Sequence, residues 1–202
     1  MRVCALPSGQ VEAALAYLGC RARVLTLDPR SLAEVLDSIL AVGQAAGVPG
    51  RAERLVADLR ARLAQVAARV AHRARPKAAV IEWVDPPFTA GYWVPDLVTA
   101  AGGLPVAGRS GEPSVAASWA EIAASEPGLI VVAPCGYHLA GAAEQARMAA
   151  DALPGLPVWA IDADGIIVRP GPRLVTGVEA LAAVLHPGAA VPARPGSIQR
   201  VA

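Results

Sequence analysis

The residues best suited to chemistry in this sequence are aromatic, and they are concentrated in one short stretch. Trp83, Phe88, Tyr92 and Trp93 lie within residues 81–96, so sixteen positions hold half of the eight aromatic residues in the chain. Proline and glycine separate them, and an apolar run comes just before. Flat rings on a loop can stack against a large planar ligand, although a single tryptophan is more often a core residue. The pattern favours a recognition surface for a planar or macrocyclic ligand.

A second loop carries the residues that suggest catalysis. Cys135 and His138 are three residues apart, a spacing at which a nucleophile and its base could meet, and Tyr137 lies between them. The sequence places no acidic residue beside them, and Pro-Cys-Gly is equally typical of a tight turn. His72, His138 and His186 belong to separate segments, so no metal site is predicted. A small α/β enzyme that uses Cys135 and His138 is the alternative to a binding protein.

Two arginines flank a rigid turn in the C-terminal part of the chain. Arg169 and Arg173 surround Pro-Gly-Pro, directly before an apolar helical pattern. A positive charge is unfavourable at the start of a helix, so Arg173 is expected to have either a ligand or a carboxylate as its partner. Asp162 and Asp164 are the candidate carboxylates, and the sequence leaves both roles open.

Alternating strand and helix patterns predict the scaffold that carries these loops. Such alternation is typical of a parallel sheet covered by helices on both faces. Because parallel strands end at the same edge of a sheet, the aromatic loop and residues 108–112, 134–138 and 162–165 are expected to open on one surface, with the two arginines nearby. The predicted strands are Ala78 to Trp83, Leu104 to Ala107, Leu129 to Ala133 and Val158 to Ile161, and the predicted helices cover residues 94–101, 119–124, 139–152 and 171–185.

The N-terminal part predicts helices around a single strand. Ser8 and Ser31 can cap two helices, with a strand from Ala22 to Leu27 between them. Residues 51–75 contain no glycine or proline and repeat apolar residues at three and four positions, which predicts one helix roughly 35 to 40 Å long. The predicted divisions are an incomplete N-terminal α/β lobe (1–47), a long connecting helix (48–75), a Rossmann-like lobe (76–188) and a mobile tail (189–202).

Composition narrows the classes of partner. The 202 residues include 18 basic and 17 acidic side chains, for a net charge of +1 without a basic stripe, which disfavours nucleic acid and anionic membranes. Cys4, Cys20 and Cys135 are too few and too far apart for a disulfide framework or a zinc site. No apolar run is long enough for a signal peptide or a membrane span, so no export signal is predicted and the location is left open.

Several segments together resemble the cobalamin-binding substrate-binding proteins of ABC transporters. The segments are residues 80–97, 133–137 and 169–175, and the likeness includes residues 27–32 and runs over nearly the whole chain up to about Pro187. The resemblance implies two Rossmann-like lobes joined by one long helix, with the ligand held between the lobes. It also implies a non-enzymatic protein without a cofactor, whose partner is a membrane ABC permease and whose family is normally extracytoplasmic.

The resemblance further implies which side chains bind. Aromatic rings are expected to contact the corrin ring of cobalamin or a related corrinoid, and arginines are expected to orient its polar periphery. Family members carry a complete first lobe, whereas this sequence joins that lobe at residues 3–8, so half of the cleft is expected to be missing. A siderophore or haem is the alternative ligand. The residues predicted to bind are Trp83, Phe88, Tyr92, Trp93, Tyr137, Arg169 and Arg173.

Overall fold

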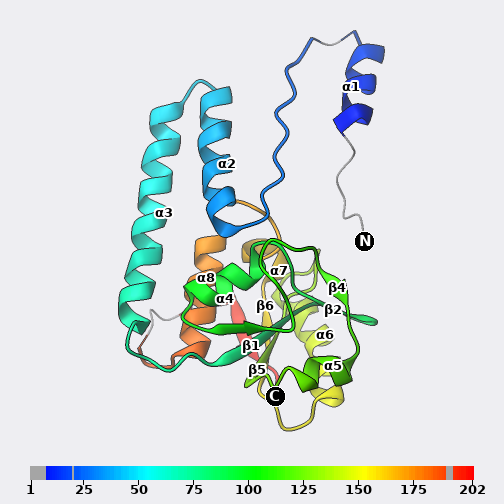
Figure 1. Ribbon diagram of the computed structural model, residues 1–202, viewed down its shortest axis with the longest axis vertical. Coiled ribbons are helices and arrows are strands. Elements are labelled where there is room, and N and C mark those ends of the chain that lie inside the picture. The colour runs from blue at the N-terminus through cyan, green and yellow to red at the C-terminus, as the bar shows by residue number, and fades with distance from the viewer. Residues whose placement is uncertain (1–7, 20, 190–192) are drawn as a thin grey trace.

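The computed structural model describes residues 8–19, 21–189 and 193–202, and a mostly parallel sheet forms its centre (Figure 1). The strand order is β4-β2-β1-β5-β6-β7, and β3 also pairs with β1. β3, β1, β5 and β6 are parallel, whereas β2, β4 and β7 run antiparallel to their neighbours. In the described part of the chain the strands are β1 (Lys77–Val84), β2 (Pro87–Thr89), β3 (Leu104–Val106), β4 (Val115–Ala116), β5 (Leu129–Val132), β6 (Val158–Ile161) and β7 (Ile198–Arg200).

The parallel strands are the four that the sequence predicts, so the α/β fold is confirmed. The remaining strands have two or three residues each and pair antiparallel with their neighbours, and no apolar run in the sequence marks them. One of them corrects a prediction. The tail from residue 189 is predicted to be mobile, but Ile198 and Arg200 pair with Ile161 and Trp159 at the edge of the sheet.

Side chains alternate along the strands and form a core on each face of the sheet. Ala78 and Val80 of β1 pack with α4 (Val94–Ala100) and α8 (Leu174–Leu185). Ala79 and Ile81 face the other way, toward α5 (Trp119–Ala124) and α6 (Leu139–Ala152). Because helices cover both faces, the loops at the strand ends are the part of the sheet that is open to a ligand.

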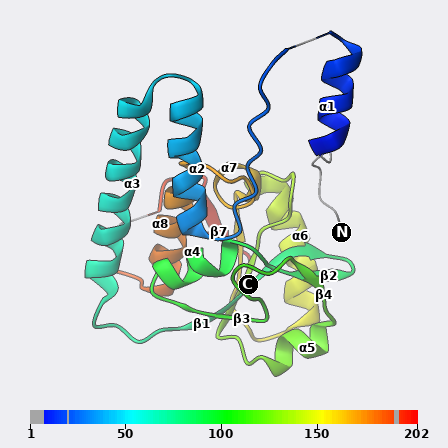
Figure 2. The ribbon, with the colours of Figure 1, turned by 45° about the horizontal axis from the view of Figure 1, so that its top comes forward.

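Two helices form a hairpin beside this lobe (Figure 2). α2 (Leu32–Ala45) begins at Ser31, whose side chain accepts a hydrogen bond from the Glu34 N–H as predicted. α3 (Pro49–Val70) runs back along α2, and Gly43 permits the close approach because a Cβ there would lie 2.3 Å from the Ala52 Cβ.

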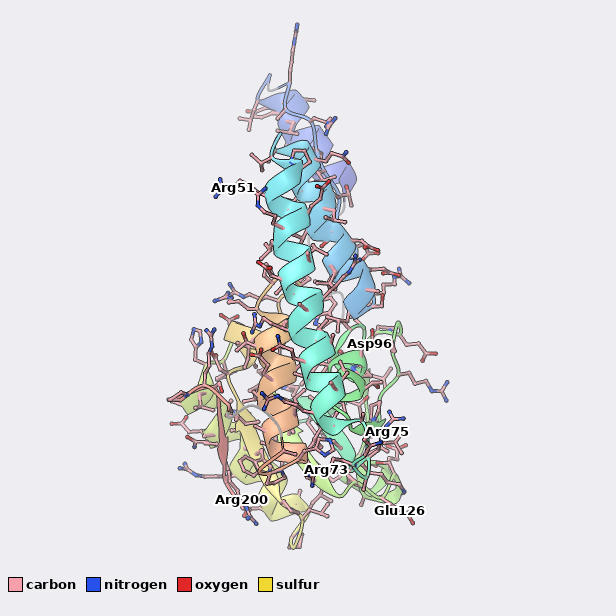
Figure 3. The ribbon with its side chains drawn as sticks, turned by 90° about the vertical axis from the view of Figure 1, so that its left-hand side faces the viewer. Arg51, Arg73, Arg75, Asp96, Glu126 and Arg200 are labelled. Atoms are coloured by element: carbon pink, nitrogen blue, oxygen red, sulfur yellow. The ribbon has the colours of Figure 1, made fainter. Side chains whose placement is uncertain are left out.

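α3 is shorter than the predicted connecting helix. It has 22 residues and is therefore about 33 Å long. It ends at Val70 because residues 71–76 turn the chain into β1, and Arg75 stabilises this turn by donating to the Gly103 carbonyl oxygen at 2.9 Å. Figure 3 shows Arg51 and Arg73 near opposite ends of the helix, and both side chains are exposed.

The hairpin is fixed to the lobe through both of its helices. In α3, Arg62 donates to the Glu179 carboxylate of α8 at 2.7 and 2.9 Å and to the Thr176 hydroxyl at 3.1 Å. The hydrogen bond with Glu179 raises the pKa of Arg62, and partial burial opposes this effect. In α2, the Leu32 N–H donates to an Asp96 carboxylate oxygen of α4 at 2.8 Å. The hairpin and the lobe therefore form one unit.

α1 (Ser8–Tyr17) lies apart from the lobe and is connected to it through residues 21–30 (Figure 1). The strand predicted from Ala22 to Leu27 is not formed, and the side chains of Val24, Leu25 and Leu27 are exposed. A strand needs a neighbour to satisfy its backbone groups, and no described residue supplies one. Among the helices of the described residues, none is long and apolar enough to cross a membrane.

Candidate functional site

Three loops leave the C-terminal ends of β1, β5 and β6 and meet at one edge of the sheet. They comprise residues 85–93, 133–138 and 162–173, and with the adjoining Trp83 they contain every predicted site residue. We call this surface the loop edge. The Asp164 N–H donates to the Tyr137 carbonyl oxygen at 3.0 Å, and the Trp93 indole N–H donates to the Ile167 carbonyl oxygen at 2.9 Å. These contacts confirm the expectation that the loops open together.

Trp83 and Tyr137 come from different loops and meet ring to ring. Their centroids are 6.0 Å apart and their planes are inclined by 55°. Both side chains are half-buried, and the Trp83 indole N–H donates to the Asp85 carbonyl oxygen at 2.9 Å. Phe88, also half-buried, lies directly opposite Trp83 in the β1–β2 pairing. Three of the predicted aromatic residues are thus brought together.

Tyr92 and Trp93 form the second aromatic pair. Their rings are stacked, with centroids 6.1 Å apart and planes inclined by 27°. Trp93 is half-buried and packs against the main core in addition to its hydrogen bond with Ile167. Tyr92 has a φ of 50°, and the Glu112 carbonyl oxygen accepts a hydrogen bond from its N–H. Trp93 therefore packs against the core and also lies at the loop edge.

Glu82 is a residue that sequence reasoning missed. Its carboxylate accepts hydrogen bonds from the Ser114 hydroxyl and, at 3.4 Å, from the Gly91 N–H. Burial raises the pKa of Glu82, and the two hydrogen bonds oppose this rise. Gly91 is required for this packing because a Cβ there would lie 2.4 Å from the Ser114 nitrogen. The signal in the sequence is a carboxylate in the interior of the apolar strand β1, which precedes the aromatic loop.

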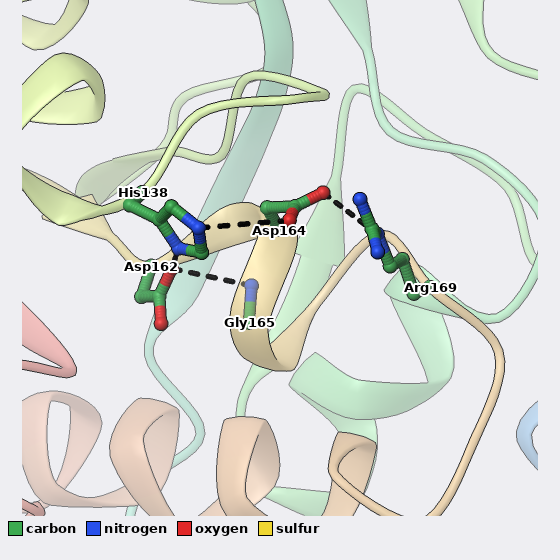
Figure 4. A network of polar contacts seen from close by, with 5 residues as sticks. All are labelled: His138, Asp162, Asp164, Gly165 and Arg169. Carbon is green, nitrogen blue, oxygen red and sulfur yellow. Dashed lines mark hydrogen bonds and ion pairs between the residues drawn. The ribbon is translucent and has the colours of Figure 1, made fainter.

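A network of polar side chains joins the other two loops (Figure 4). His138 Nδ1 lies 2.8 Å from Asp162 Oδ1, and His138 Nε2 lies 3.8 Å from Asp164 Oδ2. On its other side, Asp164 forms an ion pair with Arg169, in which Oδ1 and Nε are 2.7 Å apart. Asp162 also caps α7 (Ala163–Ile166) by accepting a hydrogen bond from the Gly165 N–H at 3.2 Å. Asp164 is the member that lies between His138 and Arg169.

The network decides whether Asp162 or Asp164 is the partner of Arg173, a question that the sequence leaves open. Asp162 pairs with His138 and Asp164 pairs with Arg169, so neither aspartate is the partner of Arg173. Arg173 is exposed at the start of α8 and forms no ion pair with any described residue. The carboxylate interpretation of Arg173 is therefore wrong.

Hollows and metal-binding groups do not point to a competing site. An open hollow of about 360 Å³ lies between α2, α3 and α4, and its lining includes Leu36, Leu63 and Ala100 but none of the predicted ligand residues. Among the described residues, no cluster of three or more histidine, cysteine, aspartate or glutamate side chains could hold a metal ion.

Comparison with known sequences places the chain in a family. The sequence pattern of the periplasmic binding protein family matches residues 7–163, more than half of the chain. The chain belongs to this family. No curated protein matches it by sequence. The family consists of solute-binding proteins, so this periplasmic binding protein is not an enzyme, and the alternative that uses Cys135 and His138 is wrong.

Solved structures with the same fold include binding proteins for different solutes. A periplasmic heme binding protein from Pseudomonas aeruginosa is 25% identical, with a TM-score of 0.71 over 95% of this chain and 72% of that one. The periplasmic vitamin B12 binding protein of Vibrio cholerae is 24% identical, with a TM-score of 0.62 over 89% of this chain and 69% of that one.

A third structure is a periplasmic binding protein from Veillonella parvula. It is 22% identical with a TM-score of 0.64, and 77% of this chain aligns with 57% of that one. The chain described here therefore spans less than two thirds of the length of the Veillonella parvula protein.

Proposed function

We propose that this periplasmic binding protein binds cobalamin or a related corrinoid at the loop edge and delivers it to an ABC permease. The observation that carries the proposal is that two aromatic pairs, Trp83 with Tyr137 and Tyr92 with Trp93, lie on β1 and on the segments that follow β1 and β5. A corrin ring is broad, largely apolar and edged with amides, so it matches a surface of flat rings with a few polar groups at its border.

The aromatic residues supply the contact area in this proposal. Trp83, Phe88, Tyr92 and Tyr137 are half-buried, so each side chain is partly held by the protein and partly accessible to a ligand. Ring contacts contribute roughly 0.5 to 1.5 kcal/mol each beyond the burial of apolar area. Several such contacts together give useful affinity, because the supported rings lose little conformational freedom when the ligand binds.

The arginines supply the polar contacts. Arg169 is held by Asp164 through Nε, and Arg173 is exposed at the start of α8 without an ion-pair partner among the described residues. A guanidinium group donates to carbonyl oxygens in a fixed planar geometry, which suits the amide side chains at the edge of a corrin ring.

Titration with cyanocobalamin tests the proposal. We expect saturable binding in equilibrium dialysis, measured by the visible absorbance of the corrinoid, and a several-fold to tenfold loss of affinity in Trp83→Ala. Trp119→Ala is the matched control, because Trp119 is also half-buried but lies on α5, outside the loop edge. Equal affinity in wild type and Trp83→Ala, or equal losses in both variants, would contradict the proposed site.

Haem is the second candidate ligand. The similarity to the Pseudomonas aeruginosa heme binding protein extends over 95% of the chain at 25% identity, and the aromatic pairs would suit a porphyrin ring as well. Haemin titrated under the same conditions separates the candidates. Binding of haemin at least tenfold tighter than that of cyanocobalamin would replace the corrinoid proposal with the haem one.

A further inference from the structure

We propose that Asp164 determines the specificity of the loop edge by balancing the charge of Arg169, so that the site takes a chelate edged with amides and rejects one edged with carboxylates. This inference rests on the proposed function, because it concerns the ligand of the same site. The observation behind it is that Asp164 stands between Arg169 and the loop that carries Tyr137 and His138 (Figure 4).

The Asp164 carboxylate is largely shielded from solvent and lies against Arg169. Its side chain is only 14% exposed, and its Oδ1 lies 2.7 Å from Nε of Arg169, whose own side chain is 66% exposed. The aspartate is itself held, because its backbone N–H donates to the Tyr137 carbonyl oxygen at 3.0 Å. A carboxylate 2.7 Å from Nε restrains the guanidinium, and the exposed side chain of Arg169 keeps N–H donors that a ligand can reach.

The pair offers hydrogen-bond donors without offering net charge. The Nη groups of a paired arginine still donate to a carbonyl oxygen, but the pair attracts an anion far less than an unpaired arginine does. The carboxylate of Asp162 lies close by and is shared with His138 Nδ1 at 2.8 Å, so an incoming carboxylate would meet two acidic side chains beside one arginine. An amide meets no such repulsion.

Arg173 is the remaining charge on this loop. It is exposed and forms no ion pair with any residue that the structure describes, so it attracts anions to the same degree whether or not Asp164 is charged. Its contribution therefore cancels when wild type is compared with a variant of Asp164. The comparison isolates the effect of neutralising Arg169.

Two corrinoids with the same ring test this inference directly. Dicyanocobinamide carries amide side chains, and dicyanocobyrinic acid carries carboxylates in their place. We expect wild type to bind the amide compound more tightly by roughly tenfold or more, and Asp164→Asn to narrow that preference. In the variant, cobinamide should bind about three- to tenfold more weakly because Arg169 is no longer oriented, while cobyrinic acid should bind more tightly.

Asp151→Asn is the matched control, because it makes the same chemical change at an exposed position in the last turn of α6 and should alter neither affinity. Arg169→Gln provides an independent arm, since it leaves Asp164 unpaired. Arg169→Gln should weaken the binding of both compounds, and the binding of cobyrinic acid more. The preference for the amide compound should therefore increase in Arg169→Gln, whereas it should decrease in Asp164→Asn. Thermal unfolding by circular dichroism identifies any variant that fails to fold, and the Arg169→Gln arm then decides.

The outcomes separate the two proposals. Wild type that binds neither corrinoid overturns the proposed function and the inference together. If wild type binds cobinamide but either Asp164→Asn or Arg169→Gln leaves the ratio of the cobinamide and cobyrinic acid affinities unchanged, only the inference about Asp164 is overturned. Opposite shifts of the preference in the two variants support it, since a general loss of structure would weaken both compounds by the same factor.

Discussion

Removing each of the two tryptophans at the loop edge should separate recognition from stability. Trp93 packs against the main core and donates to the Ile167 carbonyl oxygen, 74 residues along the chain. Trp83 donates only to the Asp85 carbonyl oxygen, two residues away, and its ring meets Tyr137 at the edge of the molecule. Trp93→Ala should therefore lower the free energy of unfolding by about 2 to 4 kcal/mol, from lost apolar burial and one lost hydrogen bond. Trp83→Ala should lower it by about 1 kcal/mol.

Urea denaturation followed by circular dichroism measures both free energies, and equilibrium dialysis with cyanocobalamin measures both affinities without relying on tryptophan fluorescence. Trp93→Phe is a useful control, because it keeps a ring in the core and removes the indole donor, for a loss of about 1 kcal/mol. Equal destabilisation by Trp83→Ala and Trp93→Ala would mean that Trp83 is a core residue. Full cobalamin affinity in a folded Trp83→Ala would refute its role in recognition.

Three further changes test individual contacts. Burial raises the pKa of Glu82, so the contribution of protonated Glu82 to stability is present below the ordinary glutamate pKa of 4.5 and is lost as pH rises through the higher pKa of the folded state. Glu82→Gln should reduce this loss of stability in urea denaturation at a series of pH values. An unchanged pH dependence of stability in the variant would argue against the role of Glu82. Gly91→Ala should cost about 1 to 3 kcal/mol, because the new Cβ would lie 2.4 Å from the Ser114 nitrogen, and a stable variant would mean that this loop can shift freely. A double-mutant cycle with Arg62→Gln and Glu179→Gln should give a coupling free energy of about 1 to 2 kcal/mol in urea denaturation, whereas additive losses would show that the pair does not fix α3 to α8.

The parallel core could be predicted because each element there has a strong local signal. β6 and α5 begin and end at the predicted residues, since an apolar run in one case and the Ser118–Glu121 capping box in the other mark their limits. The sequence does not predict the hairpin strand β2, because its three residues show no pattern of their own and form a strand by pairing with β1 and β4. The strand predicted at residues 22–27 does not form for the opposite reason. Its local sequence pattern favours a strand, but no described strand lies beside it.

The location of the candidate site could be predicted from the sequence, but the partners of its charged residues could not. Aromatic residues at the end of an apolar strand indicate where a ligand could lie, whatever the order of the strands. The partners of charged residues depend on tertiary structure, which is why Asp164 appeared in the sequence only as one of two possible partners for Arg173. The structure instead pairs it with Arg169, five residues along the chain, because α7 and the following loop bring these two side chains together.

The bond between the Leu32 N–H and Asp96 has a mechanical consequence. Residues 21–29 form no backbone hydrogen bond with another described residue, whereas from residue 32 onward the chain is bonded to the lobe through α2. Rotation within residues 21–29 therefore reorients α1 relative to the sheet without breaking a backbone hydrogen bond to another described residue, and the α2/α3 hairpin turns with the sheet as one rigid body. Amide hydrogen exchange should record this as a step within two or three residues of Leu32, from unprotected amides before it to protected ones after it.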